Sequence, residues 1–223
     1  MTNAAPTTAP RVPLTKERVL EAAVELADRN GIDALSMRKL GQQLGVEGMA
    51  LYRHVRDKDD LLDGIVDVVM GEVEVPDGHG DWKSRMRKLA HGARAVMLRH
   101  PWAPAQIVAR PGTGPATLRH IDSVLRILES GGFSIDMAHH ALHVLGSRVF
   151  GFTQDPFDDK DQQTPDPATA AAFAQALAAT YPNVGKLALA ATHDGGLGAC
   201  DDDFEFAFGL DLILDGLERR SSA

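Results

Sequence analysis

The chain has 223 residues, 44% of them hydrophobic, so it can bury a substantial core without covalent staples. Its single cysteine, Cys200, excludes an intrachain disulfide, and no apolar run reaches the roughly 18 residues that a membrane-spanning helix needs. The start MTNAAPTTAPRVP lacks the apolar core of a signal peptide. These features predict a soluble cytoplasmic protein with no membrane partner, and the net charge of −8 argues at first against nucleic acid.

Residues 1–13 are rich in Ala, Thr and Pro and are predicted to form a flexible arm. Its Arg11 can reach a phosphate or the minor groove, and a tail without a role is the alternative. Thr15 is a good N-cap for a helix that runs to about Asn30, and Gly31 suits its end. One face of this helix is apolar and consists of Val19, Ala23, Leu26 and Ala27.

The stretch from Ser36 to Lys58 carries the clearest functional pattern. Ser36 is a suitable N-cap, and the apolar residues after it recur at helical spacing. Gly45 offers the positive-φ conformation that ends a helix tightly, and residues from Glu47 to Val55 can form a second short helix. Two short helices joined by a glycine-containing turn predict a helix-turn-helix.

The second short helix has the composition of a recognition helix. Small residues let its backbone approach a groove, and hydrogen-bond donors suit phosphates and base edges. Five basic residues stand against two acidic ones between positions 36 and 58, a local charge of +3. Residues 1–58 carry +2 and residues 59–223 carry −10, so the acidic body orients the basic end toward DNA. The small and donor residues are Gly48, Ala50, Tyr52, Arg53 and His54.

The run L-G-x-x-L-G-V-x-x-x-x-L-Y-x-H-V-x-x-K-x-x-L-L, from Leu40 to Leu62, closely resembles the DNA-binding domain of TetR-family transcriptional repressors. The similarity extends from Lys16 to Leu62, with Gly41 where the family usually has Ala. The resemblance implies DNA contacts at matching positions, and two neighbouring basic residues join them as candidates. The full set is Arg38, Lys39, Gly48, Ala50, Tyr52, Arg53, His54 and Lys58.

Within this set, the resemblance implies different roles. Tyr52 and Lys58 are expected to hold phosphates, and Arg38 can read guanine. Gly48 and Ala50 stand where the family's best-known member has polar side chains, so a different operator sequence is expected. A solvated helix residue without a DNA contact is the alternative at each position.

After this motif, Asp57 is a predicted N-cap for a helix from Lys58 to about Glu72. This helix is apolar enough to contact both the DNA-binding unit and the following domain, so we predict that it is the lever between them. Pro and Gly within residues 73–80 predict a loop. Further helices are predicted over residues 81–99, 102–109, 115–130, 134–154, 167–181, 184–192 and 202–220, with a polar loop at 155–167.

Two of these helices carry more apolar surface than one core contact requires. Such a pair typically forms a four-helix interface about a two-fold axis, which predicts a homodimer through the 134–154 and 202–220 helices. The H-P-W of His100 to Trp102 and the ending F-G-L-D-L-I-L-D-G-L-E resemble the tetracycline-repressor-type C-terminal branch of the family. The two apolar stripes of the last helix are Leu210, Ile213, Leu214 and Leu217, and Phe204 and Phe208.

The resemblance also implies a small-molecule inducer of unknown identity. Gln106 and Ala109 stand where the best-known member holds a drug-bound Mg²⁺ through His and Thr, so neither a resident metal nor tetracycline is expected. No cofactor is expected either. Aromatic and Met residues of amphipathic helices are the predicted pocket lining, with ordinary core residues as the alternative. They are Met70, Trp82, Met86, Met97, Trp102, Ile107, Phe133, His143 and Phe150.

A second hypothesis, from another functional class, is a helical metal-binding protein or enzyme. His139 and His143 share a helix face at i, i+4 and could hold two corners of a zinc site, but no third ligand is evident. No nucleotide-binding, zincin or nucleophile-elbow motif occurs, and the acidic residues after Cys200 disfavour its thiolate. An enzyme is therefore not expected.

The sequence thus predicts an all-α chain of three parts: a flexible arm at 1–13, a three-helix DNA-binding domain at 14–60, and a helical ligand-binding and dimerisation domain at 61–223. The resemblance implies a repressor that binds a pseudo-palindromic operator in double-stranded DNA and is released by its inducer.

Overall fold

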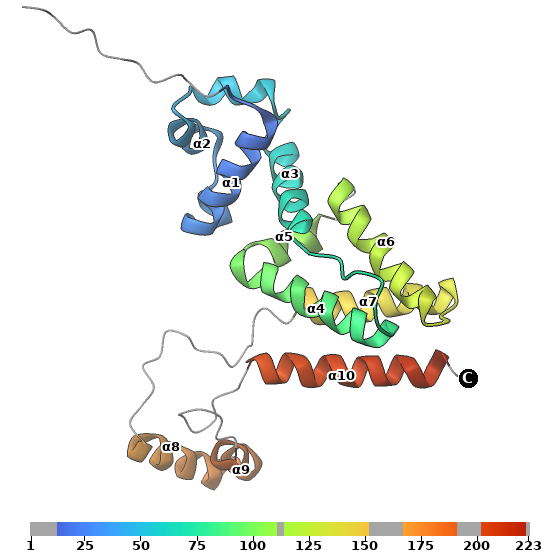
Figure 1. Ribbon diagram of the computed structural model, residues 1–223. Helices are drawn as coiled ribbons and strands as arrows, with labels where there is room; N and C mark the ends of the chain where they lie inside the picture. Colours follow the sequence, from blue (N-terminus) through green and yellow to red (C-terminus); the bar gives the residue numbers. More distant parts are fainter. Residues whose placement is uncertain (1–12, 111–113, 152–166, 191–201, 222–223) are drawn as a thin grey trace, which may run out of the picture. The chain divides into compact units, whose positions relative to one another are not determined.

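The computed structural model describes residues 13–110, 114–151, 167–190 and 202–221, and every regular element within these ranges is helical (Figure 1). The prediction of an all-α fold is confirmed. The predicted arm lies outside the described residues except for Pro13. None of the described helices is long and apolar enough to cross a bilayer.

The chain divides into two compact units. The first contains residues up to 74 together with 95–121, and the second contains 75–94 together with the residues from 122 onward. These cuts differ from the boundary at residue 60 that the sequence suggested, which stays a prediction. Both α4 and α6 contribute one part to each unit.

The first unit contains the elements that the sequence predicted for DNA binding. In order they are α1 (Lys16–Asn30), the 3-10 helix η1 (Ile32–Ala34), α2 (Met37–Leu44), the 3-10 helix η2 (Gly48–Arg53) and α3 (Lys58–Gly71). The end of α4 (Trp82–Arg99), α5 (Ala103–Ala109) and the start of α6 (Pro115–Ser130) complete this unit. The second unit adds α7 (Ile135–Gly151), α8 (Pro167–Thr180), α9 (Pro182–Ala190) and α10 (Asp202–Ser221).

The helices of the first unit begin at the caps predicted from the sequence. The Thr15 hydroxyl accepts a hydrogen bond from the amide of Arg18, and the Ser36 hydroxyl accepts one from Lys39, each at 3.3 Å. The Asp57 carboxylate accepts the amide of Asp60 at 2.8 Å. Each cap satisfies one of the amides that have no partner in the first turn of a helix.

The core of the first unit is built on the apolar face predicted for α1. This face is buried together with Leu40 of α2, Leu51 of η2 and Leu61 of α3, and each of those three leucines is fully inaccessible. α1 packs against both α2 and α3. A rigid three-helix core of this kind fixes the direction in which the solvent-facing side chains of η2 point.

In the second unit, α10 lies along α4, where three ion pairs join them: Lys83 with Asp215 at 2.6 Å, Lys83 with Glu218 at 2.8 Å, and Arg87 with Asp211 at 2.7 Å. The hydrogen bonds that Lys83 donates to Asp215 and then to Glu218, together with the negative charges of these carboxylates, raise the pKa of Lys83. α10 also packs against α7.

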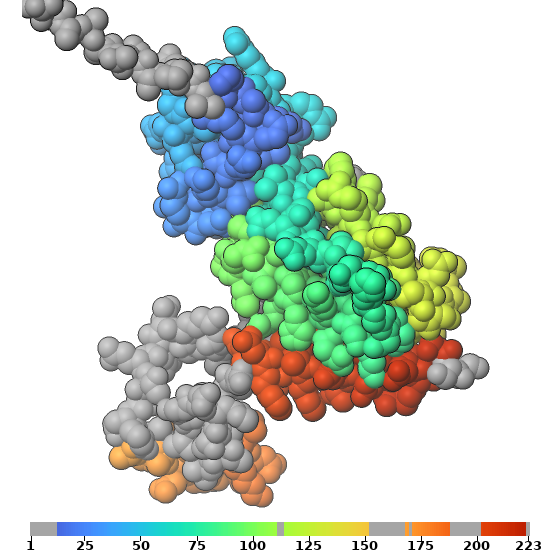
Figure 2. All heavy atoms as spheres, in the orientation of Figure 1, coloured from blue at the N-terminus to red at the C-terminus, as the bar shows by residue number. Residues whose placement is uncertain are grey.

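One of the two apolar stripes predicted on α10 belongs to the chain's own core. Leu210, Leu214 and Leu217 are buried within the single chain. Phe206 is also fully buried, with the guanidinium carbons of Arg94 and Arg148 5.0 and 5.2 Å from its ring centre. The other face of α10 exposes Phe204, Phe208 and Leu212. The helix is drawn in red in Figure 2, where part of it lies at the surface.

Candidate nucleic-acid interface

The 3-10 helix η2 presents one face to the core and another to solvent. Leu51 and Val55 are buried against the first unit, whereas Met49, Tyr52 and Arg53 are exposed. Residues at i and i+3 lie above one another in a 3-10 helix, so Met49 and Tyr52 form one column on the outer face. The predicted second helix is therefore present, but as a 3-10 helix of six residues with Glu47 as its N-cap.

The eight predicted DNA contacts all lie in the first unit. Five of them are exposed: two at the start of α2, two on η2 and one at the first position of α3. Gly48, Ala50 and His54 are only partly accessible. The exposed residues are Arg38, Lys39, Tyr52, Arg53 and Lys58.

Two glycines allow the turn and η2 to lie close to α2. A Cβ atom at Gly41 would lie 2.8 Å from the carbonyl oxygen of Val46 and 2.9 Å from the nitrogen of Gly48. A Cβ atom at Gly48 would lie 3.1 Å from the carbonyl oxygen of Met37, so its missing side chain is directed at α2. Gly45 ends α2 in the left-handed region at φ 69°, as predicted.

The start of α3 is held by a compact ionic group. The Asp60 carboxylate accepts the amide of Arg56 at 2.8 Å and lies 4.0 Å from the ammonium of Lys16. The hydrogen bond from the Arg56 amide lowers the pKa of Asp60. This arrangement leaves Lys58, the first residue of α3, exposed next to η2.

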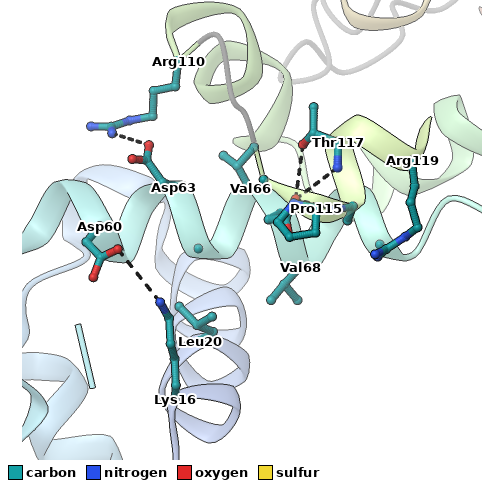
Figure 3. A pocket seen from close by; sticks show the side chains of 15 residues that line it. Lys16, Leu20, Asp60, Asp63, Val66, Val68, Arg110, Pro115, Thr117 and Arg119 are labelled. Atoms are coloured by element: carbon teal, nitrogen blue, oxygen red, sulfur yellow. Dashed lines mark hydrogen bonds and ion pairs between the residues drawn. The ribbon is translucent and has the colours of Figure 1, made fainter. Parts of the chain in front are cut away.

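Further along α3, Asp67 caps another helix. Its Oδ1 accepts the backbone amides of Ala116 and Thr117 at 2.9 and 3.0 Å, in the first turn of α6 (Figure 3). A Cβ atom at Gly114 would lie 2.1 Å from this oxygen, so glycine leaves the carboxylate room. The helix α3, which was predicted to be the lever, is therefore joined to the start of α6 by the Asp67 carboxylate. This cap comes from a distant helix and not from the residues just before α6.

Arg110, at the end of α5, also binds α3. Its guanidinium donates to Asp63 at 2.8 Å and to Asp59 at 2.5 Å, and these hydrogen bonds, first the one to Asp59 and then the one to Asp63, raise its pKa. Arg110, Asp63 and Asp67 line an open groove of about 730 Å³, and Figure 3 shows Lys16 and Leu20 on its other side. None of the nine predicted ligand contacts lines this groove. Sequence reasoning missed it because its walls come from three separate segments.

A third set of contacts joins α1, the end of α3 and the turn after α4. The rings of His100 and Trp102 both contact the carboxylate of Asp28 in α1. His100 Nδ1 lies 2.8 Å from Asp28 Oδ1, and Trp102 Nε1 donates a hydrogen bond to the same oxygen at 2.7 Å. His100 Nε2 lies 3.2 Å from the carboxylate of Glu72, which also accepts from Arg99 at 2.6 Å. The H-P-W segment noted in the sequence is therefore a junction of three elements.

The predicted ligand contacts are divided between the two units, and the pocket stays a prediction. Met70, Met97, Trp102 and Ile107 belong to the first unit, and the other five belong to the second. Most of the nine are buried, whereas His143 is exposed. Within the second unit, the rings of Trp82 and Phe133 meet edge to face, 4.7 Å apart, and Met86 is buried. Phe150 is partly accessible.

The histidines of α7 do not form a metal centre with other ligands in the described chain. The rings of His139 and His143 lie 4.7 Å apart, as their i, i+4 spacing requires. No group of three His, Cys, Asp or Glu residues suited to a metal ion occurs among the described residues. His140 lies 4.0 Å from Asp136 on the same helix.

Comparison with known proteins agrees with this geometry. The family model described as "Bacterial regulatory proteins, tetR family" matches residues 19–65, and that described as "Tetracyclin repressor-like, C-terminal domain" matches residues 76–221. The HTH-type transcriptional repressor DrrR1 of Streptomyces coeruleorubidus is 32% identical over 220 residues, which cover 96% of this chain and 80% of that protein. Tetracycline repressor protein class D of Escherichia coli is 29% identical over 214 residues, covering 94% and 92%.

Solved structures give the same result. The crystal structure of apo ActR from Streptomyces coelicolor matches with a TM-score of 0.76 and 29% identity, covering 95% of this chain and 98% of that chain. ActR in complex with actinorhodin matches with a TM-score of 0.74 and 30% identity, covering 95% and 100%. These matches favour a regulator over the alternative of a metal-binding protein or enzyme. With a family model across residues 76–221 and a 32% identical relative across almost the whole chain, this protein belongs to the TetR family of ligand-responsive, DNA-binding transcriptional regulators.

Proposed function

We propose that this chain is a repressor that binds a pseudo-palindromic operator as a homodimer and is released by a small molecule. The observation that carries the proposal is the two-sided helix-turn-helix. Arg38, Tyr52 and Arg53 are exposed, while Leu40 and Leu51 of the same two helices are fully buried. Donors on a rigid scaffold can meet phosphates and base edges without rearrangement.

The roles within this interface follow from position and chemistry. Tyr52 and Lys58 hold phosphates at the two ends of the segment that follows the turn, and Arg38 reads guanine. Lys39, Arg53 and His54 add donors beside them, and Gly48 and Ala50 let the backbone approach. The protein has no catalytic activity in this proposal, because the site binds and releases DNA without chemistry.

The exposed stripe on α10 supports the homodimer. Phe204, Phe208 and Leu212 recur every four residues and are each more than half exposed. A two-fold axis beside α10 brings the same stripe of a second copy against it, and the 134–154 helix completes a four-helix interface. Its residues 152–154 lie outside the described chain. Two recognition helices can then enter successive major grooves, roughly 34–36 Å apart.

The inducer acts by binding the DNA-free form more tightly than the DNA-bound form. Linkage requires that an inducer and the operator weaken each other by the same factor, with a coupling on the order of 1–3 kcal/mol. We propose that the nine aromatic, Met and His residues identified from the sequence contribute to its pocket. Gln106 and Ala109 offer no metal anchor for tetracycline. ActR was crystallised with actinorhodin, so actinorhodin is the first compound to test.

Binding of the purified protein to genomic fragments tests the DNA-binding part. Fragments retained on a filter at low and moderate salt are sequenced, and we expect a small set that shares an inverted repeat and loses affinity steeply with salt. Retention of all fragments alike, or of none, would contradict the proposal.

Calorimetry tests the release. Actinorhodin, or another compound that raises the melting temperature, is titrated into the protein with and without its operator. We expect a 5- to 150-fold weaker affinity in the presence of operator, the fold-change that corresponds to the coupling above. Equal affinities in the two titrations would exclude release by a shift of conformation.

A further inference from the structure

The start of η2, which is the predicted recognition helix, carries one long apolar side chain, that of Met49. Met49 is 75% exposed, on the outer face of η2 in one column with Tyr52. Large apolar side chains at the surface are usually scattered and need no explanation. Met49 differs because it stands in the segment whose neighbours Tyr52 and Arg53 supply donors to DNA.

The residues beside Met49 cannot read a base edge by hydrogen bonding. Gly48 has no side chain, and a Cβ atom there would be directed at Met37 rather than outward. Ala50 has a methyl group only, and its amide already donates to Glu47 at 2.8 Å. The first residues of a recognition helix are those that reach base edges most directly. In this protein they are Gly, Met and Ala, so Met49 alone among them extends beyond a methyl group.

An apolar side chain in the major groove has one complementary group. Thymine carries a C5-methyl group there, and the other three natural bases present only hydrogen-bond donors and acceptors or bare ring edges. The flexible, polarisable thioether of Met fits irregular apolar surfaces. We propose that Met49 reads a thymine methyl group in each half-site of the operator, and so replaces polar readout at the start of the recognition helix. This inference rests on the proposed function, because it names what the same interface recognises.

The test removes a single methyl group from the DNA. An operator is first selected from a pool of random 30-base-pair duplexes with the intact protein. Each thymine is then replaced by uracil, which lacks the methyl group and keeps every hydrogen-bonding atom. At one position in each half-site we expect the dissociation constant to rise about fourfold, the factor that corresponds to about 0.8 kcal/mol for one buried methyl group.

Variants of the protein show whether Met49 makes the contact. Met49→Ala should bind the thymine and uracil duplexes equally, and Met49→Leu should keep the preference for thymine. Val108→Ala is the matched control, because Val108 is 71% exposed and lies on α5 outside the helix-turn-helix, so the preference for thymine should be unchanged. Circular dichroism checks that each variant is folded.

Three results would overturn the assignment while leaving the proposed function intact. They are a selected operator without thymine in the half-sites, a wild-type protein indifferent to uracil at every position, and a folded Met49→Ala protein that still prefers thymine. Failure to enrich any sequence from the random pool would instead refute the proposed function, and this inference with it.

Discussion

Lys58 is exposed at the first position of α3. A phosphate contact from its ammonium contributes to affinity for every sequence alike, because each neutralised phosphate releases counterions. We expect Lys58→Ala to weaken binding to all duplexes and to lower the slope of log affinity against log salt by about one unit. Titrations at several salt concentrations measure the slope. Lys88, exposed on α4, provides the control variant Lys88→Ala, and an altered operator preference with an unchanged slope would show that Lys58 reads bases.

Gly41 sets how closely the turn approaches α2. Because the atoms nearest to an added Cβ belong to the backbone of Val46 and Gly48, Gly41→Ala must displace the turn. We expect it to lower the free energy of unfolding by about 1–3 kcal/mol, as for other overpacked sites, and to weaken operator binding because η2 moves. Urea unfolding and DNA titration measure the two effects.

Gly92 on α4 is the matched control for Gly41. A Cβ atom there meets nothing within 4 Å, so Gly92→Ala should stabilise the helix by about 0.5–1 kcal/mol through backbone entropy. If both variants behaved alike, the close packing at Gly41 would not restrict the turn.

At the residue scale, the sequence predicted whatever depends on near neighbours. The caps at Thr15, Ser36 and Asp57 were predictable because donor and acceptor lie three residues apart. The exposure of Met49 was not, because it depends on how η2 is rotated against the core. The resemblance marked Gly41 as a departure from the family's usual Ala, but its closeness to the backbone of Val46 and Gly48 is visible only in the structure.

The first turn of α6 depends on a carboxylate of α3, which couples the two elements. Asp67→Ala removes the acceptor of the Ala116 and Thr117 amides, and we expect a loss of about 1 kcal/mol of stability, as for other caps. Hydrogen exchange of a peptide covering residues 114–121 should quicken. Asp67→Asn keeps an acceptor oxygen and should retain most of the protection. Equal exchange in the Ala variant and the wild type would show that this cap does not hold α6.

Glu72, at the end of α3, gives the junction with α4 a dependence on pH. Burial alone would raise its pKa, but hydrogen bonds from Arg99 and His100 outweigh burial and lower it below the usual 4.5. A carboxylate with a lowered folded pKa stabilises the fold above its unfolded value and loses this contribution as the pH falls through the folded value. We therefore expect the urea midpoint to fall more steeply below about pH 4.5 in the wild type than in Glu72→Gln. Parallel curves would contradict this role.

The elements themselves were largely predictable from helical spacing and from Pro and Gly positions. The predicted helix at 115–130 is α6, and that at 202–220 is α10 with one more residue. The second short helix is a 3-10 helix of six residues, a form that occurs mostly in short pieces and that the apolar spacing did not distinguish from an α-helix. The sequence showed two apolar stripes on α10 but not which of them faces the chain's own core, because only packing against α4 and α7 distinguishes them.

Assembly of the whole molecule can be separated from its folding with two substitutions on α10. Phe208 is 53% exposed and Leu214 is fully buried in the chain. We expect Phe208→Glu to yield a folded monomer, because a charge at the interface opposes association. Leu214→Glu should unfold the chain, because it places an unpaired charge in the core. Light scattering at micromolar concentration, with circular dichroism, distinguishes these outcomes, and an unchanged dimer for Phe208→Glu would place the interface elsewhere.

For the whole molecule, the sequence predicted an all-α regulator because the helix-turn-helix motif from Leu40 to Leu62 indicates both the fold and DNA binding. The inducer pocket was less predictable, because aromatic and Met residues serve ordinary cores as well as they serve ligands. Trp82 illustrates this: its ring packs edge to face on Phe133, an arrangement that needs no ligand. The groove beside Arg110 and Asp67 has no signature in the sequence, because its lining residues come from three separate segments between positions 16 and 119.

The two tryptophans are intrinsic fluorescence probes, one in each unit of the chain. Trp102 donates to Asp28 in the first unit, and Trp82 lies against Phe133 in the second. Because each unit holds one indole, Trp82→Phe leaves an emission that reports on the junction with α1, and Trp102→Phe leaves one that reports on the second unit. Stopped-flow mixing of each variant with operator or inducer would then measure the rate of the fluorescence change in each unit separately and show which unit changes first.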